Sequence, residues 1–283
     1  MAARNEPARD GATAIQRPPL VRELLLVAGL FLVYKLGRLL VTGHTGEAFD
    51  NAQHVWDLER ALNLPGEGAV QSALLHGDGL VHLANTYYAT VHFPATAAFL
   101  VWLYLRRPTH YVWARRALAA ITAAALVVHL TFPLAPPRML GMADLVDTGQ
   151  VYGPTVYGAS PEADSLSNQF AAMPSLHFGW ALMVAIGLIV ATRPPVSHHH
   201  PKRNASRRPS RSSLRWLWLL HPLLTLLVIV GTANHYWLDA AVAAALLGGV
   251  LAVVRLPHRT TTASGPSKPV AAAKAPELVG AVR

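Results

Sequence analysis

Long apolar stretches alternate with shorter polar segments along most of the chain. Six of them are long enough, or nearly so, to cross a hydrocarbon core, which requires roughly 20 helical residues. They cover residues 20–41, 79–105, 111–133, 174–192, 216–233 and about 235–256. The last two nearly touch, so we expect a tight helical hairpin there. The pattern predicts an all-α polytopic membrane protein with six transmembrane helices.

The composition supports a membrane protein. Apolar residues make up 52% of the chain and charged residues only 14%, about half the usual charged share of a soluble domain. A soluble sandwich or barrel and a wholly disordered chain are therefore poor interpretations. The chain has no cysteine, which excludes disulfides, thiolate nucleophiles and Cys-based metal sites. The abundance of Ala, Arg, Gly and Leu suggests a GC-rich bacterial source.

Both ends of the chain differ from the apolar middle. Residues 1–19 are polar and contain proline, and residues 257–283 are rich in Ala, Pro, Ser and Lys. We expect both segments to be disordered, with one membrane domain over residues 20–256. No small-residue cleavage site follows the first apolar stretch, so it is expected to be an uncleaved helix rather than a signal peptide.

The net charge of +9 is explained by topology. If the six helices cross alternately, 20 of the 24 Lys and Arg residues fall on the side of the two termini, and the opposite segments hold only Arg60 and Arg138. Lys35 and Arg38, late in the first stretch, are the exceptions. The positive-inside rule then places both termini in the cytoplasm. Eleven acids lie on the outer side, and we expect no nucleic-acid partner.

A basic segment over residues 193–215 contains three adjacent histidines, His198, His199 and His200. They could bind a metal, and the basic residues beside them could bind anionic lipid. We favour a disordered cytoplasmic linker that sets the orientation of the chain.

Two outer segments could cover a site. Residues 46–64 have the pattern of an amphipathic helix lying on the outer leaflet, which could gate lipid entry or simply pack at the interface. Residues 141–172 form a long polar segment with four acids, a candidate lid or acceptor-side wall.

Two pairs of polar residues lie within the apolar stretches. Lys35 and Arg38 could extend an anion site or pair with outer acids. Tyr88 and His92 are four residues apart and could line a headgroup cavity or contact a neighbouring helix.

Three polar clusters lie at the ends of apolar stretches that all emerge on the predicted outer side. A charged group at mid-bilayer costs about 2.5 to 3.5 kcal/mol, and polar groups near a membrane are often functional. We therefore expect the clusters to form one site. They are Ala135-Pro136-Pro137-Arg138, Ala172-Met173-Pro174-Ser175-Leu176-His177 and Asn234-His235-Tyr236-Trp237-Leu238-Asp239.

The first two clusters provide groups that bind anions. Pro174 suits the first position of a helix, which would leave the amides of Ser175, Leu176 and His177 pointing outward from a positive helix end. Such an end binds phosphate well. Arg138 adds a planar guanidinium that can bind two phosphoryl oxygens at once.

The histidines provide acid, base or nucleophile. His235 and Asp239 are four residues apart and share a helix face, so the carboxylate can fix the tautomer of the imidazole. His177 is a separate proton carrier. Together with the anion-binding groups, they predict an oriented nucleophilic or basic imidazole and a second histidine that protonates a leaving oxygen.

Two other classes of function fit the same residues. A membrane metalloenzyme could use His177, His235 and Asp239 as three ligands, with water in a fourth position. A catalytically silent transporter or scaffold could place its polar residues along a path, although such a path should extend through the depth of the bilayer.

The chain also resembles the type 2 phosphatidic acid phosphatase superfamily and, within it, the branch related to inositolphosphotransferases and sphingolipid synthases. The resemblance covers most of the chain. It depends on the six helices and on three motifs in order: Pro136-Pro137-Arg138, Pro174-Ser175-Leu176-His177 and His235-Tyr236-Trp237-Leu238-Asp239.

The motifs also depart from the general pattern of that superfamily. Leu176 stands where the superfamily normally has glycine, and Thr131 and Ile229 stand where it normally has a lysine and an arginine. These changes make the chain more similar to the transferase branch.

The resemblance implies a role for each site residue. His235 would attack phosphorus and become phosphohistidine, Asp239 would orient it, and His177 would protonate the departing oxygen. Arg138 and Ser175 would bind the phosphoryl oxygens, and no metal or cofactor is implied.

The same resemblance implies the substrates and the location. The donor would be a membrane lipid with a phosphate or phosphodiester headgroup, and the acceptor would be water or a polyol such as inositol. The site would face the extracytoplasmic side of the cell membrane. The sequence leaves open the donor lipid, the acceptor and the oligomeric state.

Overall fold

The fold is built from helices. The computed structural model describes residues 17–39, 45–154, 169–193 and 211–255. Within these ranges no strand forms, and the one β-type contact is an isolated bridge between Leu134 and Ala171. The prediction of an all-α fold is confirmed. Most of the two predicted disordered ends, 1–19 and 257–283, lies outside the described residues.

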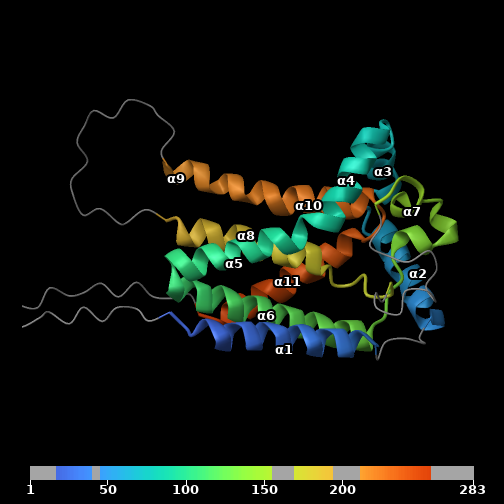
Figure 1. Cartoon of the computed structure of the whole chain (residues 1–283). Helices are drawn as coiled ribbons and strands as arrows, with labels where there is room; N and C mark the ends of the chain where they lie inside the picture. Colours follow the sequence, from blue (N-terminus) through green and yellow to red (C-terminus); the bar gives the residue numbers. More distant parts are fainter. Residues whose placement is uncertain (1–16, 40–44, 155–168, 194–210, 256–283) are drawn as a thin grey trace, which may run out of the picture.

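The longer helices lie side by side in a bundle (Figure 1). Each of the six predicted apolar stretches forms a helix or a pair of helices, with ends shifted by a few residues. In chain order they are α1 (Leu20–Leu39), α4 (Asp78–Thr90) with α5 (His92–Arg106), α6 (Pro108–Thr131), α8 (Leu176–Ala191), α10 (Leu220–Gly231) and α11 (Trp237–Val253).

The second predicted stretch, 79–105, is not one straight helix. It bends by 48° between α4 and α5. Pro94 lies just after the break and has no amide hydrogen to donate to the carbonyl of Thr90, so the regular hydrogen-bond ladder is interrupted there. The ladder resumes where the Ala95 amide donates to the Val91 carbonyl at 2.9 Å.

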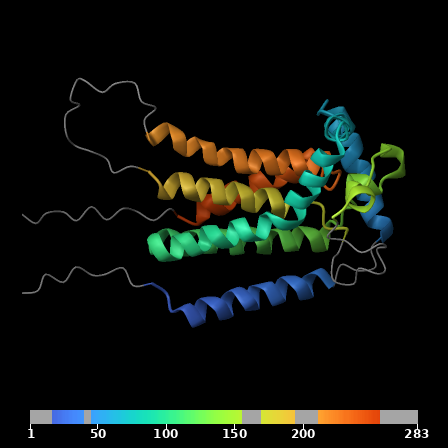
Figure 2. The same ribbon diagram turned by 45° about the horizontal axis from the view of Figure 1, so that its top comes forward.

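Shorter elements gather at one end of the bundle, at the right of Figure 1. They are α2 (Thr45–Ala61), α3 (Glu67–Leu74), η1 (Pro137–Met139), η2 (Gly141–Ala143) and α7 (Thr148–Tyr152). The first residues of α1 and the last of α11 lie at the opposite end in both ribbon views (Figures 1 and 2).

The predicted linker 193–215 is partly helical. Residues 194–210, which include the three adjacent histidines, lie outside the described residues. From Arg211 onward the chain forms α9 (Arg211–Leu214) and η3 (Arg215–Leu219), which lead directly into α10. The expectation of a linker up to residue 215 is therefore wrong for its last five residues, because they extend the apolar helix that follows.

By length and composition, α6 is the one described helix that could cross a membrane alone, and the bent pair of α4 and α5 is a second candidate. Three further apolar helices are shorter: Leu176–Ala191, Arg215–Gly231 and Trp237–Val253. The six-crossing topology and its orientation stay predictions.

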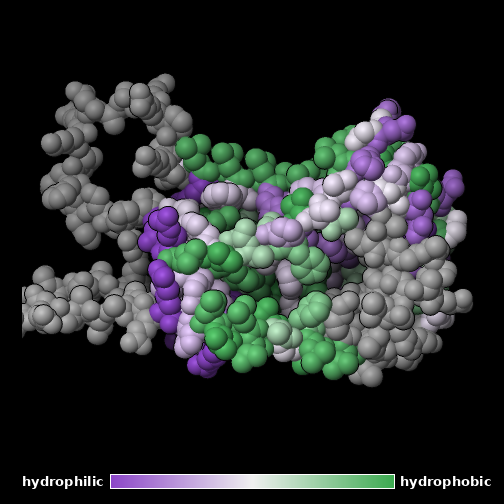
Figure 3. Space-filling model, in the orientation of Figure 1, coloured by the Kyte–Doolittle hydropathy of each residue, from purple (hydrophilic) through white to green (hydrophobic). Residues whose placement is uncertain are grey.

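The bundle has a packed interior and an apolar exterior. Its main core lies between α5, α6, α8 and α11 and includes Leu103, Ile121, Met183 and Leu247. Large apolar side chains are also exposed on the outer faces of α1, α5, α6 and α10. Figure 3 shows hydrophobic residues along the middle of one face, with hydrophilic residues toward its two ends.

Gly187 allows α8 to approach α5 closely. A Cβ atom at this position would lie 2.3 Å from the Phe99 ring, and that ring is 4% exposed within the main core. Gly248 on α11 offers a contrast, because a Cβ there would meet nothing within 4 Å. Both glycines lie within helices, so they differ mainly in the space beside them.

We therefore expect Gly187→Leu to destabilise the fold and Gly248→Leu to be tolerated. Overpacking a core costs about 1 to 3 kcal/mol, whereas leucine in an open helical position gains roughly 1 kcal/mol over glycine. Thermal unfolding of the detergent-purified variants, followed by circular dichroism, measures the difference. Equal midpoints for the two variants would contradict the packing described here.

Candidate functional site

The three polar clusters meet at the end of the bundle where α2, α3 and α7 lie. The third cluster, residues 234–239, forms the α10–α11 turn and the start of α11. Hydrogen bonds join the first cluster (135–138) and the second cluster (172–177) to it. The Arg138 amide donates to the Ala233 carbonyl at 3.0 Å, and the Ser175 amide donates to the Asp239 carbonyl at 3.1 Å. The Tyr236 hydroxyl donates to the Ala135 carbonyl at 3.2 Å. All five candidate residues named from the sequence therefore lie in one region.

His235 and Asp239 form a buried pair. The His235 Nδ1 lies 3.0 Å from the Asp239 Oδ2, and the same oxygen accepts a hydrogen bond from the Tyr236 amide at 2.9 Å. His235 is 5% exposed and Asp239 is fully buried. A carboxylate facing Nδ1 favours the tautomer with hydrogen on that nitrogen, so the lone pair of Nε2 is available for chemistry.

A tight turn places His235 in this position. The amides of Asn234 and His235 both donate to the carbonyl of Ile229, at 3.0 and 3.1 Å. Between the two helices Ala233 has a φ of 52°, in the left-handed region that costs an alanine about 1 kcal/mol or more. Such local strain persists where surrounding bonds enforce it, often at functional sites.

Ser175 is the N-cap of α8. Its hydroxyl accepts a hydrogen bond from the Phe178 amide at 3.4 Å, and Pro174 lies one residue earlier, outside the helix. The expectation that Pro174 begins the helix is therefore wrong. The Ser175 amide is also not directed outward, because it donates to the Asp239 carbonyl. Leu176 and His177 are the first two helical residues.

Aromatic rings surround His177. Its ring centroid lies 4.4 Å from that of Tyr88, 4.6 Å from that of His92 and 6.0 Å from that of His235. Tyr88 and His92 lie on either side of the bend between α4 and α5, so the bend brings both rings onto His177. Tyr88 and His92 thus contact a neighbouring helix, α8, through His177, and that they line a headgroup cavity stays a prediction.

Arg138 is held by three side chains. Its Nε donates to Asp147 at 3.0 Å, its Nη1 to Asn234 at 2.7 Å and its Nη2 to Gln169 at 3.1 Å. The Arg138 side chain is 2% exposed, whereas that of Asp147 is 34% exposed. Asp147 and Gln169 belong to the segment 141–172 that was predicted to be a lid or wall, and that segment does border the site.

The partners of Arg138 were not predicted individually. Asn234 lies within the third cluster, so an amide next to the candidate nucleophile was a signal that could have been used. Asp147 and Gln169 come from a segment without periodicity, and no spacing links them to Arg138. Residues 155–168 of that segment and the side chains of Lys35 and Arg38 lie outside what the structure describes.

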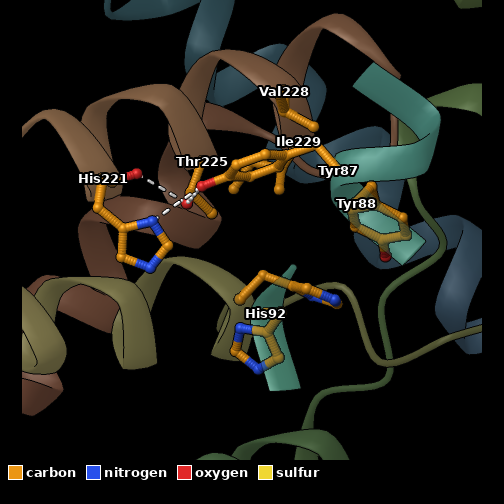
Figure 4. Close-up of a pocket in the computed structure, with 8 residues that line it drawn as sticks. Tyr87, Tyr88, His92, His221, Thr225, Val228 and Ile229 are labelled. Atoms are coloured by element: carbon orange, nitrogen blue, oxygen red, sulfur yellow. Dashed lines mark hydrogen bonds between the residues drawn. The ribbon is translucent and has the colours of Figure 1, made fainter. Parts of the chain in front are cut away.

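His177 is among the residues that line a small pocket, and Figure 4 shows this pocket with most of its lining residues labelled. The Tyr87 hydroxyl contacts His221 Nδ1 and the Thr225 hydroxyl, each at 2.9 Å. The full lining consists of Tyr87, Tyr88, His92, His177, His221, Thr225, Val228 and Ile229. The sequence did not single out Tyr87, His221 or Thr225.

The two positions where the resembling superfamily normally has cations do not supply charge here. Ile229 is fully buried and lines the pocket. Thr131 is exposed at the end of α6, and its hydroxyl donates to the Val127 carbonyl of its own helix at 2.9 Å. Neither position therefore supplies the cation that the superfamily normally has there, and Arg138 is the cation of the three motifs.

The metal-site alternative finds no geometric support in the described part of the chain. Across those ranges, no group of three or more His, Asp or Glu side chains is arranged to hold a metal ion. His235 and Asp239 are directed at each other through Nδ1 and Oδ2.

Comparison with known families assigns the chain to a superfamily. A family model described as the PAP2 superfamily matches residues 53–199 and 204–253, which is more than half of the chain. The chain belongs to the PAP2 superfamily. No curated protein and no solved structure gives a match.

The PAP2 assignment confirms the resemblance to the superfamily, and the assignment to the branch related to inositolphosphotransferases stays a prediction. Arg138, Ser175, His177, His235 and Asp239 all lie within the matched residues. PAP2 proteins are typically phosphatase-type enzymes, generally associated with membranes, that act on phosphate-bearing lipids. Membership therefore indicates a phosphoesterase or phosphotransferase activity on lipid phosphates.

We expect Arg138→Lys to lower the turnover of a lipid phosphate by roughly 100-fold, the scale of losing one preorganised charge-stabilising group. Lysine has a single nitrogen and cannot contact the three separate acceptors around Arg138 as a planar fork does. The matched control is Arg116→Lys on the exposed surface of α6, which should leave turnover unchanged. Phosphate release from detergent-dispersed lipid measures both, and equal activities would contradict the role of the guanidinium.

Proposed function

We propose that this PAP2 protein transfers a phosphoryl group from a membrane lipid through a phosphohistidine formed on His235. The observation that supports this most directly is the pair of imidazoles, His177 and His235, with ring centroids 6.0 Å apart. Of the two, His235 is bonded to a buried carboxylate. This asymmetry suits one imidazole to act as nucleophile and the other as acid.

The first half-reaction forms a bond between His235 Nε2 and phosphorus. As that bond forms, the bond from phosphorus to the departing lipid oxygen breaks, and His177 gives its proton to that oxygen. His235 becomes a positively charged phosphoimidazole while its Nδ1 hydrogen remains bonded to Asp239. The negative carboxylate stabilises the positive ring that the attack creates.

The second half-reaction returns the enzyme to its starting state. His177, now neutral, takes a proton from the acceptor hydroxyl, whose oxygen attacks phosphorus as the bond to Nε2 breaks. Because His235 must be neutral and His177 protonated at the start, the rate is expected to rise and then fall as pH increases.

Arg138 would bind the equatorial phosphoryl oxygens. Catalysis of phosphoryl transfer is mostly positioning and charge stabilisation, and Arg138 is bonded to Asn234, the residue next to His235. The Asp147 side chain is 34% exposed, whereas that of Arg138 is 2% exposed, so we propose that an incoming phosphoryl group displaces this carboxylate. The amides at the start of α8 would add a positive helix end.

The acceptor distinguishes a phosphatase from a transferase. The departures at Leu176, Ile229 and Thr131 favour the branch that resembles inositolphosphotransferases. The pocket beside His177 is lined by tyrosine and histidine rings, the Thr225 side chain and two aliphatic side chains. We propose that an alcohol such as inositol competes with water for the phosphohistidine. Product analysis with candidate phospholipids, with and without inositol, distinguishes a phosphatase, which releases phosphate, from a transferase, which forms a phosphoinositol product.

We further propose that the bundle crosses the cell membrane six times, with the site at the extracytoplasmic end. Apolar side chains exposed on the outer faces of helices are expected to contact lipid, and they are present on α1, α5, α6 and α10. Arg106, Arg107 and Arg193 lie at the other end of the bundle, which the positive-inside rule assigns to the cytoplasm.

We expect labelled phosphate from a lipid substrate to be trapped on His235 after rapid denaturation at alkaline pH. His235→Ala should abolish the label, because the nucleophile is gone. His177→Ala should keep it, formed slowly, because a second half-reaction without its base lets the intermediate accumulate. A chelator should leave the label of the unmodified protein unchanged.

Three results would contradict this account. Label that persists in His235→Ala places the nucleophile elsewhere. Activity that is lost in chelator and restored by zinc favours the metal-dependent hydrolase. Absence of both label and turnover with every phospholipid tested favours a transporter or scaffold.

A further inference from the structure

A second pair of ionisable groups lies beside the site, and the chemistry above does not use it. Glu59 near the end of α2 and Glu67 at the start of α3 are both fully buried. Glu59 occupies the last position of the buried stripe of α2, after Ala48, Ala52 and Val55. A buried carboxylate is costly unless it is paired and hydrogen-bonded, so each oxygen of this pair requires an account.

Two of the four oxygens have partners of known type. Glu59 Oε1 accepts a hydrogen bond from the Leu238 amide at 2.8 Å. Glu67 Oε2 forms a short ion pair with Arg60, whose guanidinium also lies 4.0 Å from the centroid of the Trp56 ring. The other two oxygens, Glu59 Oε2 and Glu67 Oε1, are buried and find no donor among the described residues.

A proton shared between the two carboxyl groups would provide a hydrogen bond between the two oxygens that have no other donor. Two ionised carboxylates in contact would repel each other strongly at low dielectric, whereas a carboxylic acid can donate its hydrogen to a carboxylate. Arg60 stabilises the negative charge on Glu67, so the proton belongs to Glu59. Burial is the main cause that raises the pKa of Glu59, to about 9, and the hydrogen bond with Glu67 raises it further.

Other groups around Glu59 also shift its pKa. The hydrogen bond from the Leu238 amide lowers the pKa of Glu59, whereas the charges of Glu67 on α3 and Asp239 on α11 raise it. Tyr236, at the start of α11, is fully buried close to the same acids. Arg60 on α2 is the nearby cation and is engaged by Glu67.

The Leu238 amide connects this pair to the catalytic chemistry. Leu238 is the second residue of α11, and the first amides of a helix have no partner within the helix. Glu59 satisfies this amide from another helix, while Asp239 satisfies the Tyr236 amide and His235 Nδ1 from within. One turn of α11 is therefore fixed from both sides.

We propose that protonated Glu59 is a positioning residue that holds the start of α11, and with it the His235–Asp239 pair, in the geometry required for attack. This proposal depends on the proposed function for its catalytic consequence, but the protonated buried pair can be tested without turnover. When Glu59 loses its proton, the repulsion from Glu67 and Asp239 should displace the turn that orients His235.

The dependence of stability on pH has a definite sign. The pKa of Glu59 is higher in the folded protein, about 9, than its ordinary value of 4.5. The folded state therefore holds an extra proton between these values, and stability falls as pH rises. The contribution of Glu59 is fully present below about pH 4.5 and is lost as the pH rises through about 9.

The test compares Glu59→Gln, Glu59→Ala and the control Asp57→Asn, an exposed acid on the same helix. Glutamine can accept a hydrogen bond from the Leu238 amide and donate one to Glu67, as protonated Glu59 does, but it has no proton to lose. The unfolding midpoint of Glu59→Gln should therefore fall less than that of the unmodified protein from pH 6 to 9.5. Asp57→Asn should follow the unmodified protein. A Glu59→Gln curve that overlays that of the unmodified protein would overturn the assignment of the proton.

The positioning role has its own measurements. Misplacement of a reacting group by about 1 Å can cost roughly 100-fold in rate, so Glu59→Ala should lower kcat by about that factor with KM nearly unchanged, and Glu59→Gln should restore most of kcat. In parallel, proton NMR should detect the His235 Nδ1 hydrogen bonded to Asp239 in Glu59→Gln and find it shifted or lost in Glu59→Ala.

The NMR and stability measurements separate the two proposals. If no lipid phosphate is turned over but the His235 signal changes as expected, the proposed function fails and the positioning role stands. If turnover is normal and the Glu59→Ala variant keeps both kcat and the His235 signal, the positioning role is overturned.

Discussion

The site depends on how the buried backbone between α10 and α11 satisfies its hydrogen bonds. The Ala233 carbonyl in the turn accepts from the Arg138 amide, and the Asp239 carbonyl in the first turn of α11 accepts from the Ser175 amide. Buried backbone groups without partners are costly, so these bonds stabilise the fold and join three distant motifs at the same time. The same residues that close the hairpin therefore determine where His235 points.

The helical bundle makes that convergence possible. Helices that run back and forth bring every second connection to the same end, which is why η1, the start of α8 and the α10–α11 turn meet beside α2 and α3. The bend at Pro94 then places Tyr88 and His92 against His177. The same bundle has an apolar exterior, and membership of the PAP2 superfamily indicates phosphate-bearing lipids as the substrate class.

Much of this arrangement could be predicted from the sequence because it is periodic or local. Apolar stretches of about 20 residues identify six helical segments. The pairing of His235 with Asp239 could also be predicted, but not its geometry: His235 lies in the turn before the N-cap Tyr236 of α11, not on a helix face shared with Asp239. The errors have local causes as well. Pro94 divides the second stretch, and Ser175 is the N-cap of α8, which leaves Pro174 outside the helix that it was expected to begin.

Contacts between distant residues could not be predicted in this way. The bonds of Arg138 to Asp147 and Gln169 join segments without periodicity, and their partners follow only from the packed fold. Glu59 was hidden for a different reason, because an acid in an otherwise apolar stripe resembles a solvated position until its burial against Glu67 is known. Polar residues on buried helix faces are therefore the positions where a sequence pattern is least informative and the structure adds most.

In the proposed mechanism, His235 and His177 act on opposite sides of one phosphorus atom. Orthovanadate adopts the five-coordinate geometry of phosphoryl transfer, so an experimental structure with vanadate bound tests the claim directly. We expect vanadium to be bonded to His235 Nε2, with His177 beside the opposite axial oxygen and Arg138 at the equatorial oxygens. Vanadate bonded to His177, or bound away from both imidazoles, would contradict it.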